Sequence, residues 1–123
     1  MAREGRRHHS LRVWQDAVRL VTTIYRLTEN FPPDERYGLV SQMRRSAVSV
    51  PSNIAEGAGR GSEKEWLQFL FIARGSMSEL ETQIMVAENL GYIQSTGRLF
   101  EEIDKLFAQL GALINRIKTR IES

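Results

Sequence analysis

Apolar residues recur every three or four positions through most of this chain, the spacing of helices that bury one face. The pattern and its interruptions predict four helices, over residues 11–30, 34–59, 63–90 and 96–121. Prolines 32 and 33 end the first helix, the glycines of 57–61 end the second, and Gly91 ends the third. No run alternates as a strand would. The sequence therefore predicts an all-α protein, an antiparallel up-down four-helix bundle.

Pro51 lies inside the second predicted helix, where a proline removes one hydrogen bond and clashes with the carbonyl four residues earlier, that of Ala47. The apolar spacing continues through Pro51 without a change of phase, which favours one helix kinked at Pro51 over two helices. Ser62 and Glu65 form a predicted capping box at the start of the third helix. The candidate N-caps of the first three helices are Ser10, Asp34 and Ser62.

The apolar stripes of two helices are wider than a lone bundle needs. The stripe of the first helix covers about 180° of arc, and residues 66–73 of the third are apolar nearly all round, whereas about 100° serves a monomeric bundle. The width predicts a homo-oligomer that pairs through the first and third helices. The alternative is a monomer with ordinary exposed apolar residues. The candidate interface residues are Val13, Trp14, Tyr25, Trp66, Leu67, Phe71 and Ile72.

A continuous polar stripe runs along the second helix, opposite its apolar face. We expect this stripe to tie the second helix to the third by hydrogen bonds; a solvated face is the alternative. Gly75, in the middle of the third helix, costs about 1 kcal/mol relative to alanine. That cost predicts a close approach by the helix carrying Ser49 and Asn53. The candidate structural residues are Gln42, Arg45, Ser49, Asn53 and Glu56, with Glu79 on the third helix.

Composition places the 123 residues in one ordinary globular domain, with 41% apolar and 26% charged residues. The absence of cysteine excludes thiolate catalysis and cysteine-ligated metal sites. The first ten residues have no apolar segment behind their positive charge, so we expect a cytoplasmic protein with a flexible basic tail over 1–10 and a bundle over 11–123. No membrane partner is expected.

Charge is distributed unevenly. The net charge is only +2, but residues 1–60 hold ten arginines and no lysine against six acids. This asymmetry favours an anionic partner, and the planar guanidinium suits phosphate because it donates two parallel hydrogen bonds. The sequence therefore predicts nucleic-acid binding, with RNA favoured. The candidate binding residues are Arg3, Arg6, Arg7, Arg12, Arg44, Arg45 and Arg60.

Catalytic constellations are missing from the sequence. The two histidines, His8 and His9, both lie in the tail, so neither a bundle di-iron site nor a Ser-His-acid triad can be assembled from the helices. Residues 57–61 are rich in glycine but do not follow a strand, which excludes a phosphate-binding loop. We therefore expect no enzyme activity, no cofactor and no metal.

The order of these signals resembles the four-helix-bundle proteins encoded in bacterial 23S rRNA intervening sequences. The resemblance covers nearly the whole chain after residue 10, and its most distinctive element is Ser49-Val-Pro51-Ser-Asn53-Ile-Ala-Glu56-Gly57. The other matching stretches are Leu11-Arg-Val-Trp-Gln15, Phe31-Pro-Pro33, Tyr37-Gly-Leu-Val-Ser-Gln42, Arg45-Ser-Ala-Val, Glu65, Phe69-Leu70, Ile72-Ala-Arg-Gly-Ser76 and Glu79-Leu-Glu-Thr82.

This resemblance implies a ring-like homopentamer. It also implies kinship in fold with the accessory proteins of diversity-generating retroelements, which bind nucleic acid and a reverse transcriptase. Two functions remain open at this point: a ring that binds nucleic acid, and an adaptor ring whose partner is a protein. Trp14 and Trp66 lie on apolar stripes and are better interpreted as core or interface residues than as base-stacking platforms.

Overall fold

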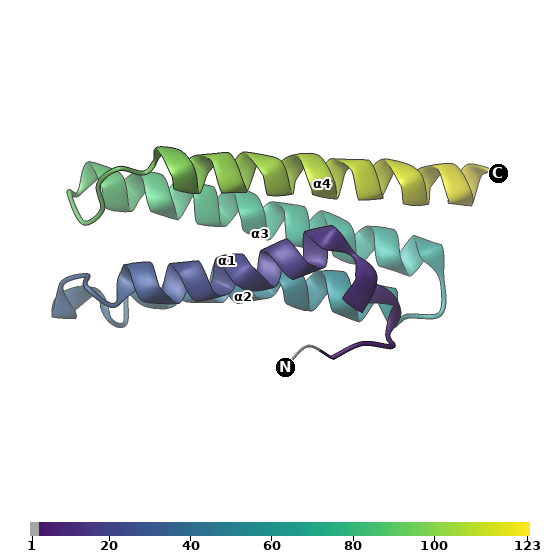
Figure 1. Cartoon of the computed structure of the whole chain (residues 1–123), viewed down its shortest axis with the longest axis horizontal. Helices are drawn as coiled ribbons and strands as arrows, with labels where there is room; N and C mark the ends of the chain where they lie inside the picture. The colour runs from purple at the N-terminus through teal and green to yellow at the C-terminus, as the bar shows by residue number, and fades with distance from the viewer. Residues whose placement is uncertain (1–2) are drawn as a thin grey trace.

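The computed structural model describes residues 3–123 and contains four α-helices with two short 3₁₀ helices (Figure 1). No strand occurs in this part of the chain, so the predictions of an all-α protein and of four helices are confirmed. None of these helices is both long enough and apolar enough to cross a membrane. In chain order the elements are η1 (Arg7–Ser10), α1 (Arg12–Thr28), η2 (Pro33–Glu35), α2 (Leu39–Ala58), α3 (Glu63–Asn89) and α4 (Gly97–Glu122).

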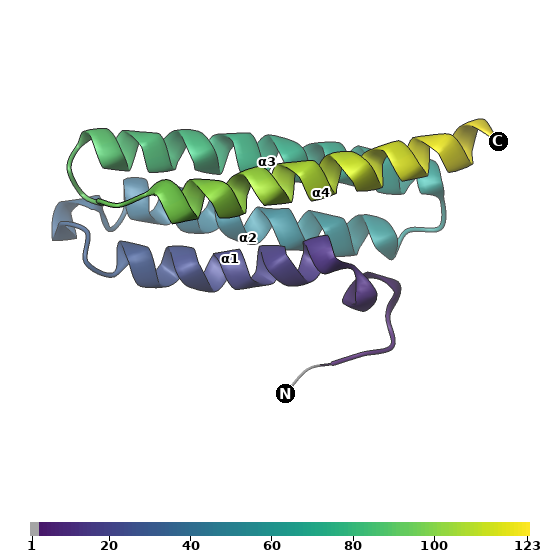
Figure 2. The same cartoon turned by 45° about the horizontal axis from the view of Figure 1, so that its top comes forward.

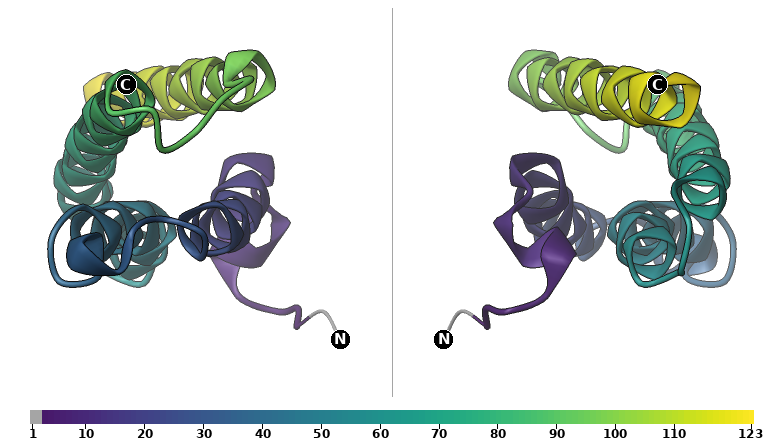
Figure 3. Two further views of the ribbon diagram at one scale, coloured as in Figure 1. Left: turned by 90° about the vertical axis from the view of Figure 1, so that its left-hand side faces the viewer. Right: turned by 90° about the vertical axis from the view of Figure 1, so that its right-hand side faces the viewer.

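The helices lie side by side in chain order, and the chain turns back at each connection (Figures 1 and 2). The end-on views show the helices in chain order around the bundle, so that α4 comes back next to α1 (Figure 3). The contact between α2 and α3 is the most extensive of the bundle, and that between α1 and α4 is the smallest between neighbouring α-helices. The chain between α1 and α2 lies at one end of the bundle, and η1 lies at the other.

A single hydrophobic core fills the space between the helices, because each contributes apolar side chains at three- and four-residue intervals. On α1 these include Ala17, Leu20 and Ile24. On α4 they continue from Ile103 to Ile117. The apolar periodicity of the sequence therefore identifies the side chains that form the core.

The starts of α1 and α2 differ from the prediction. Ser10 belongs to η1 and does not cap α1, whose N-cap is Leu11. Asp34 lies in η2, so α2 begins at Leu39, five residues later than expected. The reason is the carboxylate of Glu35, whose Oε1 accepts the N–H of Leu39 at 3.3 Å and places negative charge at the positive end of the helix dipole.

The cap of α3 agrees with the prediction in one of its two hydrogen bonds. Ser62 Oγ accepts the backbone N–H of Glu65 at 3.2 Å, but the structure shows no reciprocal bond from the Glu65 side chain to Ser62.

Pro51 is buried, and α2 continues across it.

The close approach of α2 to α3 occurs at Gly57, and the prediction that it occurs at Gly75 is wrong. A Cβ atom on Gly57 would lie 2.7 Å from Phe69 Cβ and 2.7 Å from Trp66 Cδ1, whereas nothing lies within 4 Å of a Cβ on Gly75. Glycine is therefore needed at Gly57, because the Trp66 side chain packs directly against its backbone.

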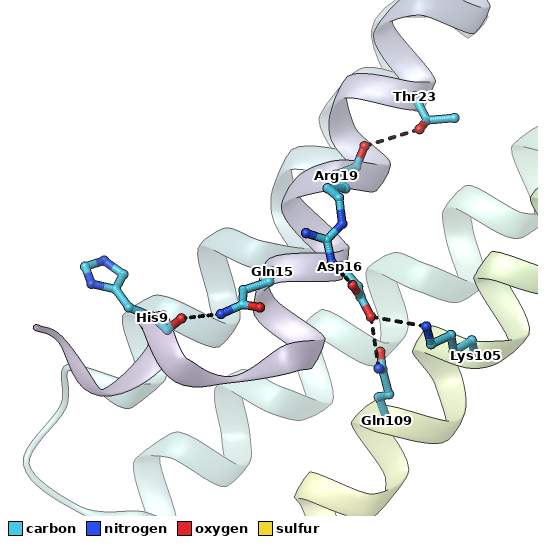
Figure 4. Close-up of polar contacts among 7 residues, drawn as sticks. All are labelled: His9, Gln15, Asp16, Arg19, Thr23, Lys105 and Gln109. Atoms are coloured by element: carbon cyan, nitrogen blue, oxygen red, sulfur yellow. Dashed lines mark hydrogen bonds and ion pairs between the residues drawn. The ribbon is translucent and has the colours of Figure 1, made fainter. Parts of the chain in front are cut away.

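Residues 7–10, which belong to the tail predicted over residues 1–10, contact the start of α1; Met1 and Ala2 of that tail lie outside the described residues. The rings of His8 and His9 lie 5.0 and 5.3 Å from the ring of Trp14. Gln15 Nε2 donates to the His9 carbonyl at 2.7 Å (Figure 4). Aromatic contacts and this hydrogen bond together hold the segment on α1.

Candidate nucleic-acid interface

An open groove of about 660 Å³ runs over α1, α2 and the chain that joins them. Its lining combines basic and aromatic side chains: Tyr25 near the end of α1, Arg36 and Tyr37 from the connection, and Arg44 and Arg45 on α2. No acidic residue of the described chain lines it. We call this surface the basic groove. It brings together Arg44 and Arg45 of the predicted binding residues and adds Arg36, which the sequence analysis did not single out.

Arg44 is held in place by its neighbours. Its Nε donates to Thr28 Oγ1 at 2.9 Å and its Nη2 donates to the Tyr25 carbonyl at 3.2 Å. Its Cζ lies 4.5 Å from the centre of the Tyr25 ring, within cation–π range. Two of five N–H donors are thereby used, and the positive charge is fixed at the C-terminal end of α1, where the helix dipole favours a cation.

Arg36 and Arg45 are exposed and form no hydrogen bond or ion pair within residues 3–123. The guanidinium of Arg36 lies 5.7 Å from the centre of the Tyr37 ring. Arg45 also borders a second pocket, between α2 and α3, that Glu79 lines. The donors of both arginines are therefore available to an anion, and their fork geometry matches a phosphate.

The rest of the lining of the basic groove consists of two valines, Val40 and Val48, and of small polar side chains: Ser41, Ser49, Ser52 and Asn53. Asn53 Nδ2 donates to Ser49 Oγ at 2.9 Å and to the Ser49 carbonyl at 2.8 Å. Ser49 Oγ in turn lies 2.8 Å from Ser76 Oγ on α3. Ser49 therefore links the basic groove to α3, and the hydrogen bonds from Asn53 orient the Ser49 hydroxyl.

The other residues of the predicted polar stripe differ in whether they bond across to α3. Glu79 accepts a hydrogen bond from Ser46 Oγ at 3.2 Å across the α2–α3 contact, and Ser46 is a residue that the sequence analysis missed. Glu56 instead pairs along its own helix with Arg60, at 2.8 Å. Gln42, like Arg45, is exposed and makes no hydrogen bond with the described residues.

The other candidate arginines lie at the opposite end of the bundle and are not brought to the basic groove. Arg7 lies over the Trp66 ring at 4.1 Å and pairs with Glu63 at 2.9 Å, and Arg120 pairs with the same carboxylate at 3.3 Å. Arg60 lies over the Phe69 ring at 5.0 Å. Arg3, Arg6 and Arg12 are exposed. The predicted set thus forms two separate basic regions.

The candidate interface residues fall into two groups, those buried in the chain's own core and those exposed on its surface. Val13 and Trp66 are 5% and 2% exposed inside the chain's own core, so their assignment to an intermolecular interface is wrong. Trp66 owes its burial to the bare backbone of Gly57 on one side and to Arg7 on another. Trp14 is half-buried under η1 and Tyr25 lies in the basic groove. The other candidates, Leu67, Phe71 and Ile72, line an open and mainly apolar surface together with Ile121, Lys64 and Gln68.

A further polar cluster joins α1 to α4 (Figure 4). Asp16 accepts hydrogen bonds from Arg19 and from Gln109 Nε2, the latter at 3.0 Å, and Lys105 Nζ lies 3.8 Å away. Burial alone would raise the pKa of Asp16, but the hydrogen bonds and the two cations outweigh it and hold this pKa below its ordinary value. The cluster therefore stabilises the smallest helix–helix contact. Within residues 3–123 no three His, Asp or Glu side chains are grouped to hold a metal.

Comparison with known proteins gives a family. The model of the family described as 23S rRNA-intervening sequence protein matches residues 9–116. The fold is similar to the crystal structure of a protein of unknown function from the S23 ribosomal protein family of Bacteroides thetaiotaomicron VPI-5482, with a TM-score of 0.62 and 18% identity over 90% of this chain and 99% of that chain. No curated protein matches. The chain belongs to the 23S rRNA-intervening sequence protein family.

Proposed function

We propose that this protein is a non-catalytic RNA-binding protein that works in the cytoplasm as a ring-like homo-oligomer, with a pentamer favoured and no cofactor required. The observation that carries the proposal is the basic groove, where three arginines stand together without an acidic residue among the lining side chains. Two of them, Arg36 and Arg45, have all their donors free. A polyanion with regularly spaced phosphates is the ligand that best satisfies such a set.

Assembly would strengthen this binding. One chain carries a net charge of only +2, but a ring of five would carry about +10 and hold five grooves at high effective concentration. The apolar surface of Leu67, Phe71 and Ile72 supports assembly, because Ile72 is 51% exposed on it. Burying that surface between copies is favourable by about 25 cal/mol per Å² of apolar area.

We also propose that the four helices form an antiparallel up-down bundle in which α2 is bent at Pro51. The bend is supported by chemistry, because Pro51 has no N–H to donate to the Ala47 carbonyl and its ring crowds that carbonyl. It would fall between Arg45 and the Gly57 contact, so it would set the angle between the basic groove and α3.

Salt dependence of binding tests the function directly. With the assembled protein and a labelled single-stranded RNA, raising salt fourfold should weaken binding about 20-fold if three phosphates are neutralised. Arg36→Gln with Arg45→Gln should lower affinity and flatten this dependence. Arg98→Gln removes an exposed charge outside the basic groove and is the matched control. Absence of binding at low salt, with a protein partner retained from the native cell after nuclease treatment, would contradict RNA binding and favour the adaptor ring.

A further inference from the structure

Tyr37 is the most exposed large side chain with apolar character in the described chain, at 88%. The other two tyrosines are engaged: Arg44 covers Tyr25, and the Tyr92 hydroxyl donates to Glu35 Oε2 at 2.9 Å. The Tyr37 hydroxyl has no hydrogen-bond partner in residues 3–123. An aromatic ring with this exposure contributes little to the core, so its presence in the lining of the basic groove needs another explanation.

The backbone that carries Tyr37 is fixed on both sides. Gly38 N–H donates to the Glu35 carbonyl at 3.0 Å, and Leu39 N–H donates to Glu35 Oε1 at 3.3 Å. Glu35 is itself anchored by Tyr92, which also packs on Phe31 at 5.3 Å between ring centres. The Glu35 carboxylate lies against Gly38, where a Cβ would be 2.9 Å from Glu35 Oε1. The Tyr37 ring is therefore exposed to solvent, while hydrogen bonds hold the backbone that carries it.

Exposed aromatic faces beside arginines are the elements from which single-strand nucleic-acid sites are built, since bases stack on the ring and the backbone phosphates meet the cations. The Arg36 guanidinium lies over one face of the Tyr37 ring, 5.7 Å from its centre, and the 88% exposure of Tyr37 leaves the other face open. Arg44 and Arg45 continue the positive charge along α2. In a duplex the bases are already paired and stacked, so no base face is open to Tyr37. The ring and the arginines together therefore select an unpaired strand.

We propose that the ligand of the basic groove is single-stranded RNA, with one unpaired base stacked on Tyr37 and the adjacent phosphates bound by Arg36, Arg44 and Arg45. This inference rests on the proposed RNA-binding function and names its ligand class. The bound base lies on the open face of the ring, and its neighbours follow the basic groove toward Ser49 and Asn53. Contacts to phosphate and to a base face carry no sequence information, so binding tolerates any sequence.

The test measures the affinity of the assembled protein for three RNA probes of equal length: a single strand, the same strand in a duplex, and the strand with abasic sites in its central part. Tyr37→Ser should weaken single-strand binding about 5- to 150-fold, the range for loss of one base–aromatic stack. Tyr37→Phe keeps the ring and should stay within about twofold of the original protein. Binding of the duplex and of the abasic strand should not respond to Tyr37→Ser. Because the ring is exposed, equal melting temperatures serve as the folding control.

Two outcomes would overturn the inference, and they are distinguishable. If Tyr37→Ser binds the single strand as tightly as the original protein, while Arg45→Gln weakens all probes, stacking fails and RNA binding stands. If no probe binds at low salt, the inference and the proposed function fail together.

Discussion

The hydroxyl oxygens of Ser49 on α2 and Ser76 on α3 lie 2.8 Å apart, joining the two helices with the most extensive contact. Asn53 donates to Ser49 Oγ, which leaves the Ser49 proton free for Ser76. Part-buried hydroxyls cost free energy when unpaired, so each member of this chain depends on the next. The hydrogen bonds also fix the wall of the basic groove.

Loss of this link should destabilise the fold. Ser76→Ala and Asn53→Ala should each lower the free energy of unfolding by about 1 kcal/mol, measured by urea denaturation. Glu56→Ala is the matched control on the same face, because Glu56 pairs only with exposed Arg60, and it should change stability by less than about 0.5 kcal/mol. Additive losses in Ser49→Ala with Ser76→Ala would show that the two hydroxyls do not interact.

Two glycines in helices should respond in opposite directions to alanine. Gly57→Ala should cost about 1–3 kcal/mol, because its Cβ would meet Trp66 and Phe69 at 2.7 Å. Gly75→Ala meets nothing and should raise stability by up to about 1 kcal/mol through better helix propensity. Thermal melting of both variants checks this. Destabilisation by Gly75→Ala would mean that another molecule packs on that side of α3.

Acid should weaken the α1–α4 contact through Asp16. The pKa of Asp16 is lower in the folded chain than its ordinary value of 3.8, so its contribution is complete above about pH 4 and is lost as the pH falls through the folded pKa. The neutral Asp16→Asn should therefore show a smaller loss of stability below about pH 4 than the original protein. Parallel pH curves of the melting temperature for the two proteins would contradict this account.

The apolar surface of α3 should control assembly. Ile72→Lys places a charge among Leu67, Phe71 and Ile121 and should lower the particle mass in solution, measured by light scattering or native mass spectrometry. Thr82→Lys adds the same charge at an exposed position of α3 outside this surface and should leave the mass unchanged. An unchanged mass for Ile72→Lys would place the interface elsewhere.

Periodicity was sufficient to predict the four helices, because helix burial depends on a repeating apolar pattern that the chain displays directly. It did not predict the start of α2, since that depends on Glu35 capping a helix four residues away. Likewise the cost of Gly75 is visible in sequence, but whether a neighbour approaches depends on packing, which placed the contact at Gly57.

The candidate site was predicted less completely. Arg44 and Arg45 follow from the arginine-rich half of the chain, whereas Tyr37 belongs to no periodic pattern and is significant only for its exposure. Trp66 shows the converse: its apolar surroundings in sequence indicated an interface, yet Gly57 and Arg7 bury it within the chain. Sequence distinguishes apolar from polar positions more readily than it identifies which apolar position a neighbour will cover.

The two basic regions lie at opposite ends of the bundle, so the distance between them sets a minimum length for a ligand that contacts both. Arg7 lies before α1 and Arg36 lies after it, and the 17 residues of that helix span about 25 Å at 1.5 Å per residue. Under the proposed RNA-binding function, a short strand would occupy the basic groove alone, while a longer strand would also reach the second region, where Arg7 would exchange its pairing with Glu63 for a phosphate. Strand length, more than base sequence, would then decide which RNAs are retained.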